Sequence, residues 1–155
     1  MSLSNPELAK PFIVATRHVL VTMAQMDPKP GTPYVKKNRS ANGDVSALVG
    51  FTGDASGSIS LSFPRACAIA IVKGMLGPDV GDIIADAKDA VGEVSNMISG
   101  QARAGLSDLG IKLQGSTPTI IFGDNHYVSH VSNAPVVAIP FTTDFGEFTL
   151  EFCFS

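Results

Sequence analysis

The amino-acid sequence predicts an α+β domain with mainly antiparallel strands. Three stretches carry apolar residues at helical spacing, and the stretches between and after them alternate in hydropathy or are bounded by turn residues. The order along the chain is helix, strands, two helices, strands. Segregated runs of helices and strands of this kind are typical of the α+β class.

Composition narrows the classes of function. The 155 residues predict one domain over residues 1–155. Charged residues make up only 16% of the chain and the formal net charge is −3, which argues against nucleic-acid binding because that function needs a basic face. The longest uncharged apolar run, 19–26, is far shorter than the ~20 residues of a membrane span, and no signal peptide is expected. We therefore expect a cytoplasmic protein that binds neither nucleic acid nor membrane.

The first helix is expected over residues 7–26. Its apolar residues recur at helical spacing, and Pro11 suits the first turn or marks a kink. Residues 27–31 read Asp-Pro-Lys-Pro-Gly, which predicts that the helix ends there and that a loop follows.

Strands are expected in the next part of the chain, at 34–38, 44–52 and 57–63. Residues 53–56, Gly-Asp-Ala-Ser, predict a hairpin between the last two. Ser58, Ser60 and Ser62 alternate with apolar residues, so this strand should bury one face only.

Two further helices follow. Pro64 suits the first turn of a helix over about 64–76, which Gly77 and Pro78 should end. The longest helical pattern covers 82–109, with Asp82 as its N-cap candidate.

The remaining chain is expected to form strands separated by turns at 123–125 and 143–146. In the last strand every second residue from Phe148 to Phe154 is apolar, so these side chains should share one buried face. The expected strands are 117–122, 127–131, 136–141 and 147–154.

The long helix has two chemically different sides. Its apolar side carries Ile83, Ala87, Ala90, Val91, Val94, Ile98, Gly105 and Leu109. Its outward side carries Asp86, Asp89, Glu93, Asn96, Gly100, Arg103 and Ser107, so Glu93 and Asn96 point the same way, one turn apart.

A solvated surface is the ordinary interpretation of such a stripe. Asn96 and Gly100 argue against this interpretation, because an exposed helix gains nothing from either residue. Asn is a poor helix former, and a mid-helix glycine costs about 0.5–1 kcal/mol relative to Ala. A glycine one turn after Asn96 would instead let another surface come close.

The helix segment from Asp89 to Gly100, Asp-Ala-Val-Gly-Glu-Val-Ser-Asn-Met-Ile-Ser-Gly, resembles the signature helix of the CheC/CheX/FliY phosphatases of bacterial chemotaxis. That family's motif is Asp or Ser, then Glu, then Asn, followed by a proline further along, and the corresponding residues are Asp89, Glu93, Asn96 and Pro118. The single Glu-x-x-Asn motif makes the chain most similar to the CheX members. The resemblance implies a single sheet of about six mainly antiparallel strands with long helices packed on it.

The resemblance also implies an activity, hydrolysis of the phosphoaspartate of a CheY-like response regulator. Asn96 would position the attacking water and Glu93 would pair with a lysine of the receiver, while Asp89 and Gly100 would contact that partner. The chain would need no cofactor or metal of its own, because Mg²⁺ is held by the response regulator. A non-catalytic module that binds a receiver or motor component with the same helix is the alternative. An unrelated small hydrolase has no supporting pair of nucleophile and base.

Several other features point to ordinary structural roles. Two cysteines are too few for a disulfide framework, so Cys67 is expected to be a small buried hydrophobe, and a bridge to Cys153 is the minority interpretation. His126 and His130 lie roughly 13 Å apart if they share a strand, too far for one metal ion.

The surface features leave two expectations. Lys36, Lys37 and Arg39 are expected in a solvated loop, with docking to an acidic receiver as the alternative. CheX relatives are homodimers, and the apolar C-terminal strands are expected to offer the pairing edge.

Overall fold

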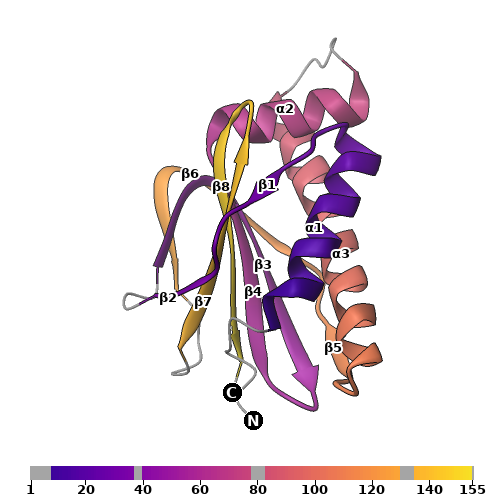
Figure 1. Cartoon of the computed structure of the whole chain (residues 1–155). Helices are drawn as coiled ribbons and strands as arrows, with labels where there is room; N and C mark the ends of the chain where they lie inside the picture. Colours follow the sequence, from indigo (N-terminus) through magenta and orange to yellow (C-terminus); the bar gives the residue numbers. More distant parts are fainter. Residues whose placement is uncertain (1–7, 37–39, 78–82, 130–134, 155) are drawn as a thin grey trace.

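The computed structural model describes residues 8–36, 40–77, 83–129 and 135–154. Three helices lie on one side of an antiparallel sheet of eight strands, which confirms the predicted α+β class (Figure 1). The helices are α1 (Ala9–Ala24), α2 (Arg65–Leu76) and α3 (Ile83–Asp108). The strands are β1 (Lys29–Pro30), β2 (Tyr34–Lys36), β3 (Ser40–Gly53), β4 (Gly57–Phe63), β5 (Leu113–Gly115), β6 (Thr119–Ser129), β7 (Val136–Thr143) and β8 (Gly146–Phe154).

The three helices follow the predicted ranges closely. Pro11 falls in the first turn of α1, and Pro64 and Gly77 flank α2. Gly77 has a positive φ of 94°, a conformation that glycine adopts without steric cost. The N-cap candidate Asp82 and Pro78 lie outside the described residues.

The order of the central strands is β1-β7-β8-β4-β3-β5, with β2 also on β7 and β6 also on β3. The sheet has two strands more than the six expected. Two short strands, β1 and β5, were not predicted; β1 lies in the 27–31 segment expected as a loop. The C-terminal strands are also not a free edge, since β8 lies between β4 and β7 and β7 is covered by β1 and β2.

The turn expected at 123–125 is wrong, because β6 runs straight through these residues. Gly43 pairs with His126 and Val45 with Phe122, so one residue of β3 faces three of β6. The turn-forming residues are accommodated as an irregularity in the ladder and do not reverse the chain. The turn at 143–146 is confirmed, with Gly146 at φ 118°.

Aromatic rings join α1 to the sheet. The ring of Phe12 stacks on that of Phe152 with centroids 4.5 Å apart, and Phe148 packs against Phe63 and Phe141. The apolar face predicted for the last strand is therefore confirmed. Cys67 is buried as expected, and neither cysteine forms a disulfide.

Both faces of β4 are buried, which contradicts the expectation that its serines face solvent. Ser60 pairs in register with Leu48 and Glu151, so side chains from both neighbouring strands surround it. On the same face the hydroxyls of Ser46 and Ser62 are hydrogen-bonded at 2.9 Å. A central position in the sheet thus buries small polar residues that an exposed strand would show to water.

The Lys36 side chain is not in a solvated loop either. Its ammonium lies 2.6 Å from the carboxylate of Glu151, and the two side chains are 15% and 0% exposed. Lys37 and Arg39 lie outside the described residues.

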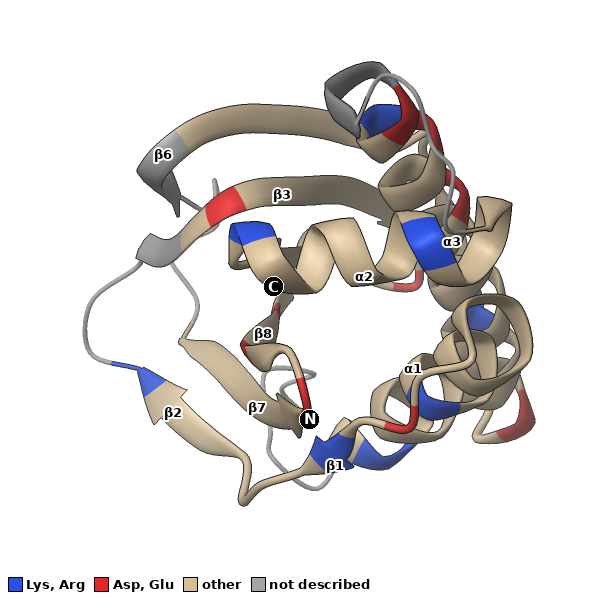
Figure 2. Ribbon diagram, turned by 90° about the horizontal axis from the view of Figure 1, so that it is seen from above, with Lys and Arg blue, Asp and Glu red and all other residues tan. Residues whose placement is uncertain are grey.

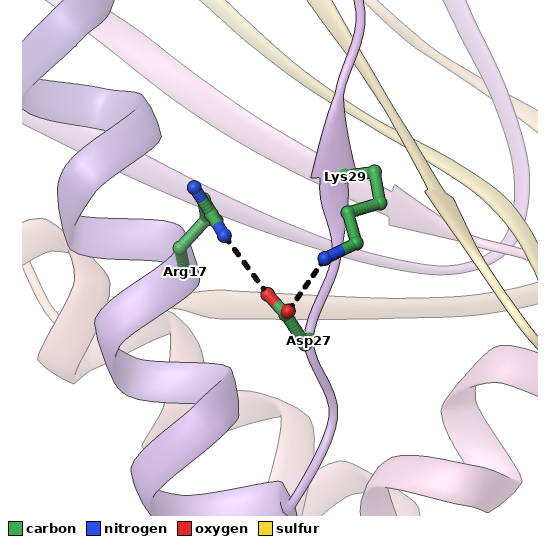
Figure 3. A network of polar contacts seen from close by, with 3 residues as sticks. All are labelled: Arg17, Asp27 and Lys29. Atoms are coloured by element: carbon green, nitrogen blue, oxygen red, sulfur yellow. Dashed lines mark hydrogen bonds and ion pairs between the residues drawn. The ribbon is translucent and has the colours of Figure 1, made fainter.

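A surface network joins the middle of α1 to β1 (Figure 3). The carboxylate of Asp27 accepts hydrogen bonds from Lys29 at 2.7 Å and from Arg17 at 3.2 Å. The hydrogen bond from Lys29, followed by that from Arg17, lowers the pKa of Asp27 below its ordinary value.

Candidate functional site

The outward side of α3 carries the candidate residues as the helical spacing predicted. Asp89, Glu93 and Asn96 are exposed, and Gly100 is half-buried. The opposite side is buried at Ala87, Ala90, Val91, Val94, Ile98, Ala102 and Leu106. Leu109, expected among them, is 60% exposed because the helix ends at Asp108, before this residue.

An open groove of about 690 Å³ runs beside this stripe. Asp89, Glu93 and Asn96 form part of its helical wall. The facing wall is formed by Thr117, Pro118 and Ile120, in the segment that leads into β6. Pro118, singled out by the family motif, therefore lies in the same groove as Glu93 and Asn96.

Two further residues of α3 line the groove and escaped the sequence analysis. A Cβ on Gly92 would lie 3.7 Å from the Ile120 side chain, so this glycine faces β6 closely. Lys88 places its ammonium 5.4 Å from the centre of the Phe122 ring, within reach of a cation–π contact. The second mid-helix glycine was the signal for this close packing.

The Gly100 position is open, as the sequence suggested. A Cβ there would meet only one neighbour within 4 Å among the described atoms, Nη2 of Arg103 at 3.9 Å. Gly100 thus leaves a low point on the helix surface, one turn beyond Asn96.

The polar side chains that line the groove are two carboxylates, an amide, a lysine and the hydroxyl of Thr117. The Asn96 carboxamide can both accept and donate a hydrogen bond, and the Glu93 carboxylate can pair with a cation. No three side chains of His, Cys, Asp or Glu converge in the part of the chain that the structure describes. An open groove with this content suits binding of a protein surface and positioning of a water molecule.

Comparison with known proteins decides the family. The sequence profile of the chemotaxis phosphatase CheX family matches residues 45–142, well over half of the chain. The chain belongs to the CheX family.

Three relatives illustrate the likeness. The CheY-P phosphatase CheX of Thermotoga maritima is 28% identical over 99 residues, which are 63% of this chain and 64% of that protein. The aligned region thus spans less than two thirds of the Thermotoga protein. The crystal structure of the chemotaxis protein CheX from Desulfovibrio desulfuricans superposes with a TM-score of 0.94 at 63% identity, covering 96% of this chain and 99% of that one.

The third relative shares the fold at lower identity. It is CheX in the crystal structure of a CheX–CheY–BeF₃–Mg²⁺ complex from Borrelia burgdorferi, with a TM-score of 0.77 and 24% identity, covering 97% of this chain and 99% of that one. None of the helices in the described ranges is long and apolar enough to cross a membrane.

Proposed function

We propose that this CheX-family protein hydrolyses the phosphoaspartate of a CheY-like response regulator and so ends its signal. The observation that carries the proposal is the exposure of Glu93 and Asn96, one turn apart, in an open groove that also contains Pro118. The names of the Thermotoga and Borrelia relatives, a CheY-P phosphatase and a CheX bound to CheY, support the same partner.

In the proposed mechanism Asn96 enters the receiver's phosphorylation pocket and holds a water molecule in line with the phosphorus–oxygen bond. The water oxygen bonds to phosphorus while the bond to the aspartyl oxygen breaks, giving inorganic phosphate and a free carboxylate, and the water proton passes to solvent. Asn96 contributes positioning, as the glutamine of a GTPase does. The receiver's own Mg²⁺ neutralises the developing charge.

Glu93 and Asp89 provide recognition in this proposal. Glu93 pairs with the lysine of the receiver pocket and fixes the docking register, and Asp89 adds negative charge one turn earlier. An acidic groove repels a free phosphate ester, so a protein substrate is favoured over a small phosphomonoester.

The test is to phosphorylate a CheY-like receiver, add this protein and follow the loss of phosphate. We expect Asn96→Ala to abolish the acceleration while binding to the BeF₃⁻-activated receiver is largely kept. Thr22→Ala, an exposed change on α1, is the matched control and should leave both unchanged. Full activity of Asn96→Ala would contradict the mechanism. Binding of the wild type without faster phosphate loss would favour the alternative, a non-catalytic receiver-binding module.

We also propose that the protein is a cytoplasmic homodimer. Its weakly charged surface and the exposed apolar side chains Val14 and Val21 on α1 support self-association. Two buried cysteines that form no disulfide agree with a reducing compartment. Sedimentation as a monomer at micromolar concentration would contradict the proposed homodimer.

A further inference from the structure

The outward side of α3 changes sign along its length. Asp86, Asp89 and Glu93 make its first half acidic, whereas Arg103 stands on the same stripe in its second half. Beyond the end of the helix the exposed Lys112 adds a second positive charge. The stripe that carries Asn96 thus runs from an acidic groove, which also contains Lys88, to a basic end at Arg103 and Lys112, which line a separate hollow.

Arg103 is held in place by the strand beside it. A Cβ on Gly115 of β5 would lie 3.0 Å from Nε of Arg103 and 3.0 Å from the Ser99 hydroxyl, so the glycine lets the guanidinium lie against the strand backbone. Nε is buried and has no hydrogen-bond partner within the described part of the chain. The side chain is therefore already ordered by packing, which lowers the entropy lost when it binds a partner.

The other end of the guanidinium reaches back along the helix toward the candidate site. Nη2 lies 3.9 Å from the place where a Gly100 Cβ would stand. Gly100 is four residues after Asn96, a helical rise of about 6 Å. Arg103 consequently brings its charge to about one turn from the residue proposed to enter the phosphorylation pocket.

A second open hollow, of about 540 Å³, continues the surface beyond Arg103 and is lined in part by Ser107, Lys112 and Asp54. The Asp54 carboxylate accepts a hydrogen bond from the backbone N–H of Lys112 at 2.7 Å. This hydrogen bond joins the β3–β4 turn to the segment directly before β5. Two cations against one carboxylate leave this end net positive in a chain whose total charge is −3.

We propose that Arg103, with Lys112 beside it, is a docking site for an acidic group on the receiver's surface, about one to two helical turns from its phosphoaspartate. This inference rests on the proposed function and names the surface chemistry of its partner. Opposite charges at the two ends of the stripe allow only one orientation of the receiver, with its basic group over Glu93 and its acidic group over Arg103. Charge complementarity of this kind mainly sets the docking register and the association rate of the two proteins. It has much less effect on the chemical step at the phosphorus.

The experiment compares three charge variants with the BeF₃⁻-activated and the phosphorylated receiver. For Arg103→Glu we expect about tenfold weaker binding and an equally raised KM, an unchanged kcat, and a weaker dependence of binding on salt. Arg103→Lys should restore most of the affinity, because it keeps the charge; a purely structural role of the planar guanidinium against Gly115 would not be rescued in this way.

Lys10→Glu is the matched control, since it makes the same charge change on α1. A Cβ on Gly105 would lie 3.1 Å from Pro11 of α1, and Gly105 lies about 200° around the helix from Arg103, so α1 covers the opposite flank of α3 (Figure 2). Unchanged binding of Arg103→Glu, or an equal loss in Lys10→Glu, would overturn the docking site.

The two proposals fail in different ways. If the wild type binds the receiver but does not speed phosphate loss, the proposed activity fails, and weaker binding by Arg103→Glu still supports the docking site. If wild type and Arg103→Glu dephosphorylate with the same KM, the activity stands and the docking site is overturned.

Discussion

The ammonium of Lys36 lies 2.6 Å from the carboxylate of Glu151, a side chain with no exposed surface. The pair joins the edge strand β2 to β8, with β7 between them in the sheet. The two residues are 115 positions apart in the chain, so the contact forms only when β2, β7 and β8 have come together.

We expect Lys36→Ala to lower the free energy of unfolding by about 3 kcal/mol, because it removes the ion pair that Lys36 forms with a fully buried carboxylate. Urea denaturation measures the loss. Lys29→Ala on the neighbouring edge strand is the control: its pair with Asp27 is exposed, so we expect a change under about 1 kcal/mol. Equal losses in the free energy of unfolding for the two variants would show that the burial of Glu151 does not depend on its ion pair with Lys36.

Two helical glycines should respond in opposite ways to alanine. At Gly92 the added Cβ meets Ile120 at an ordinary 3.7 Å, so Gly92→Ala should stabilise the protein by about 0.5–1 kcal/mol through helix propensity. At Gly74 the Cβ would collide with the backbone oxygen of Ala24, so Gly74→Ala must push α2 away from the end of α1 and should destabilise by about 1–3 kcal/mol. Thermal unfolding of both variants tests the pair, and a gain at Gly74 would contradict the close approach of the two helices.

Burial raises the pKa of the Cys67 thiol from 9.0 to about 11, with a hydrogen bond from Thr143 opposing part of the shift. Between these values the unfolded chain loses the proton before the folded protein does. Folded stability is therefore fully present below pH 9 and falls as the pH rises toward 11.

The Cys67 contribution to this loss should reach about 2 kcal/mol near pH 10.5. The Cys67→Ala variant separates this contribution from that of lysine titration. The difference in the free energy of unfolding between wild type and variant should narrow by that amount between about pH 8 and pH 10.5. A gap that stays constant over this range would mean that Cys67 ionises equally well in the folded protein.

The helices and the candidate stripe were predictable because both depend on local spacing. The helical period of 3.6 residues fixes which residues of α3 face inward. The outward position of Glu93 and Asn96 follows directly from that period. The β3–β4 hairpin was predictable for the same reason, since its turn and both strands are adjacent in the sequence.

The errors arise where a distant segment decides the local structure. Residues 123–125 have turn chemistry, but pairing with β3 draws them into a strand. The two residues of β1 have no strand pattern and are extended only because β7 lies beside them. Lys36 was read as a solvated cation because nothing near it in the sequence points to Glu151.

The last prediction concerns the open space at Gly100, where stability and the proposed function should oppose each other. A Cβ there meets the Arg103 side chain at 3.9 Å, so Gly100→Ala should raise the free energy of unfolding by about 0.5–1 kcal/mol. If this point of α3 lies against the receiver, the same methyl group separates the two surfaces beside Asn96. We therefore expect a several-fold higher KM for the phosphorylated receiver, and a larger rise for Gly100→Leu. An unchanged KM in both Gly100 variants would mean that the receiver does not approach the helix here. The receiver would then have to dock farther from Gly100 while Asn96 still positions the water.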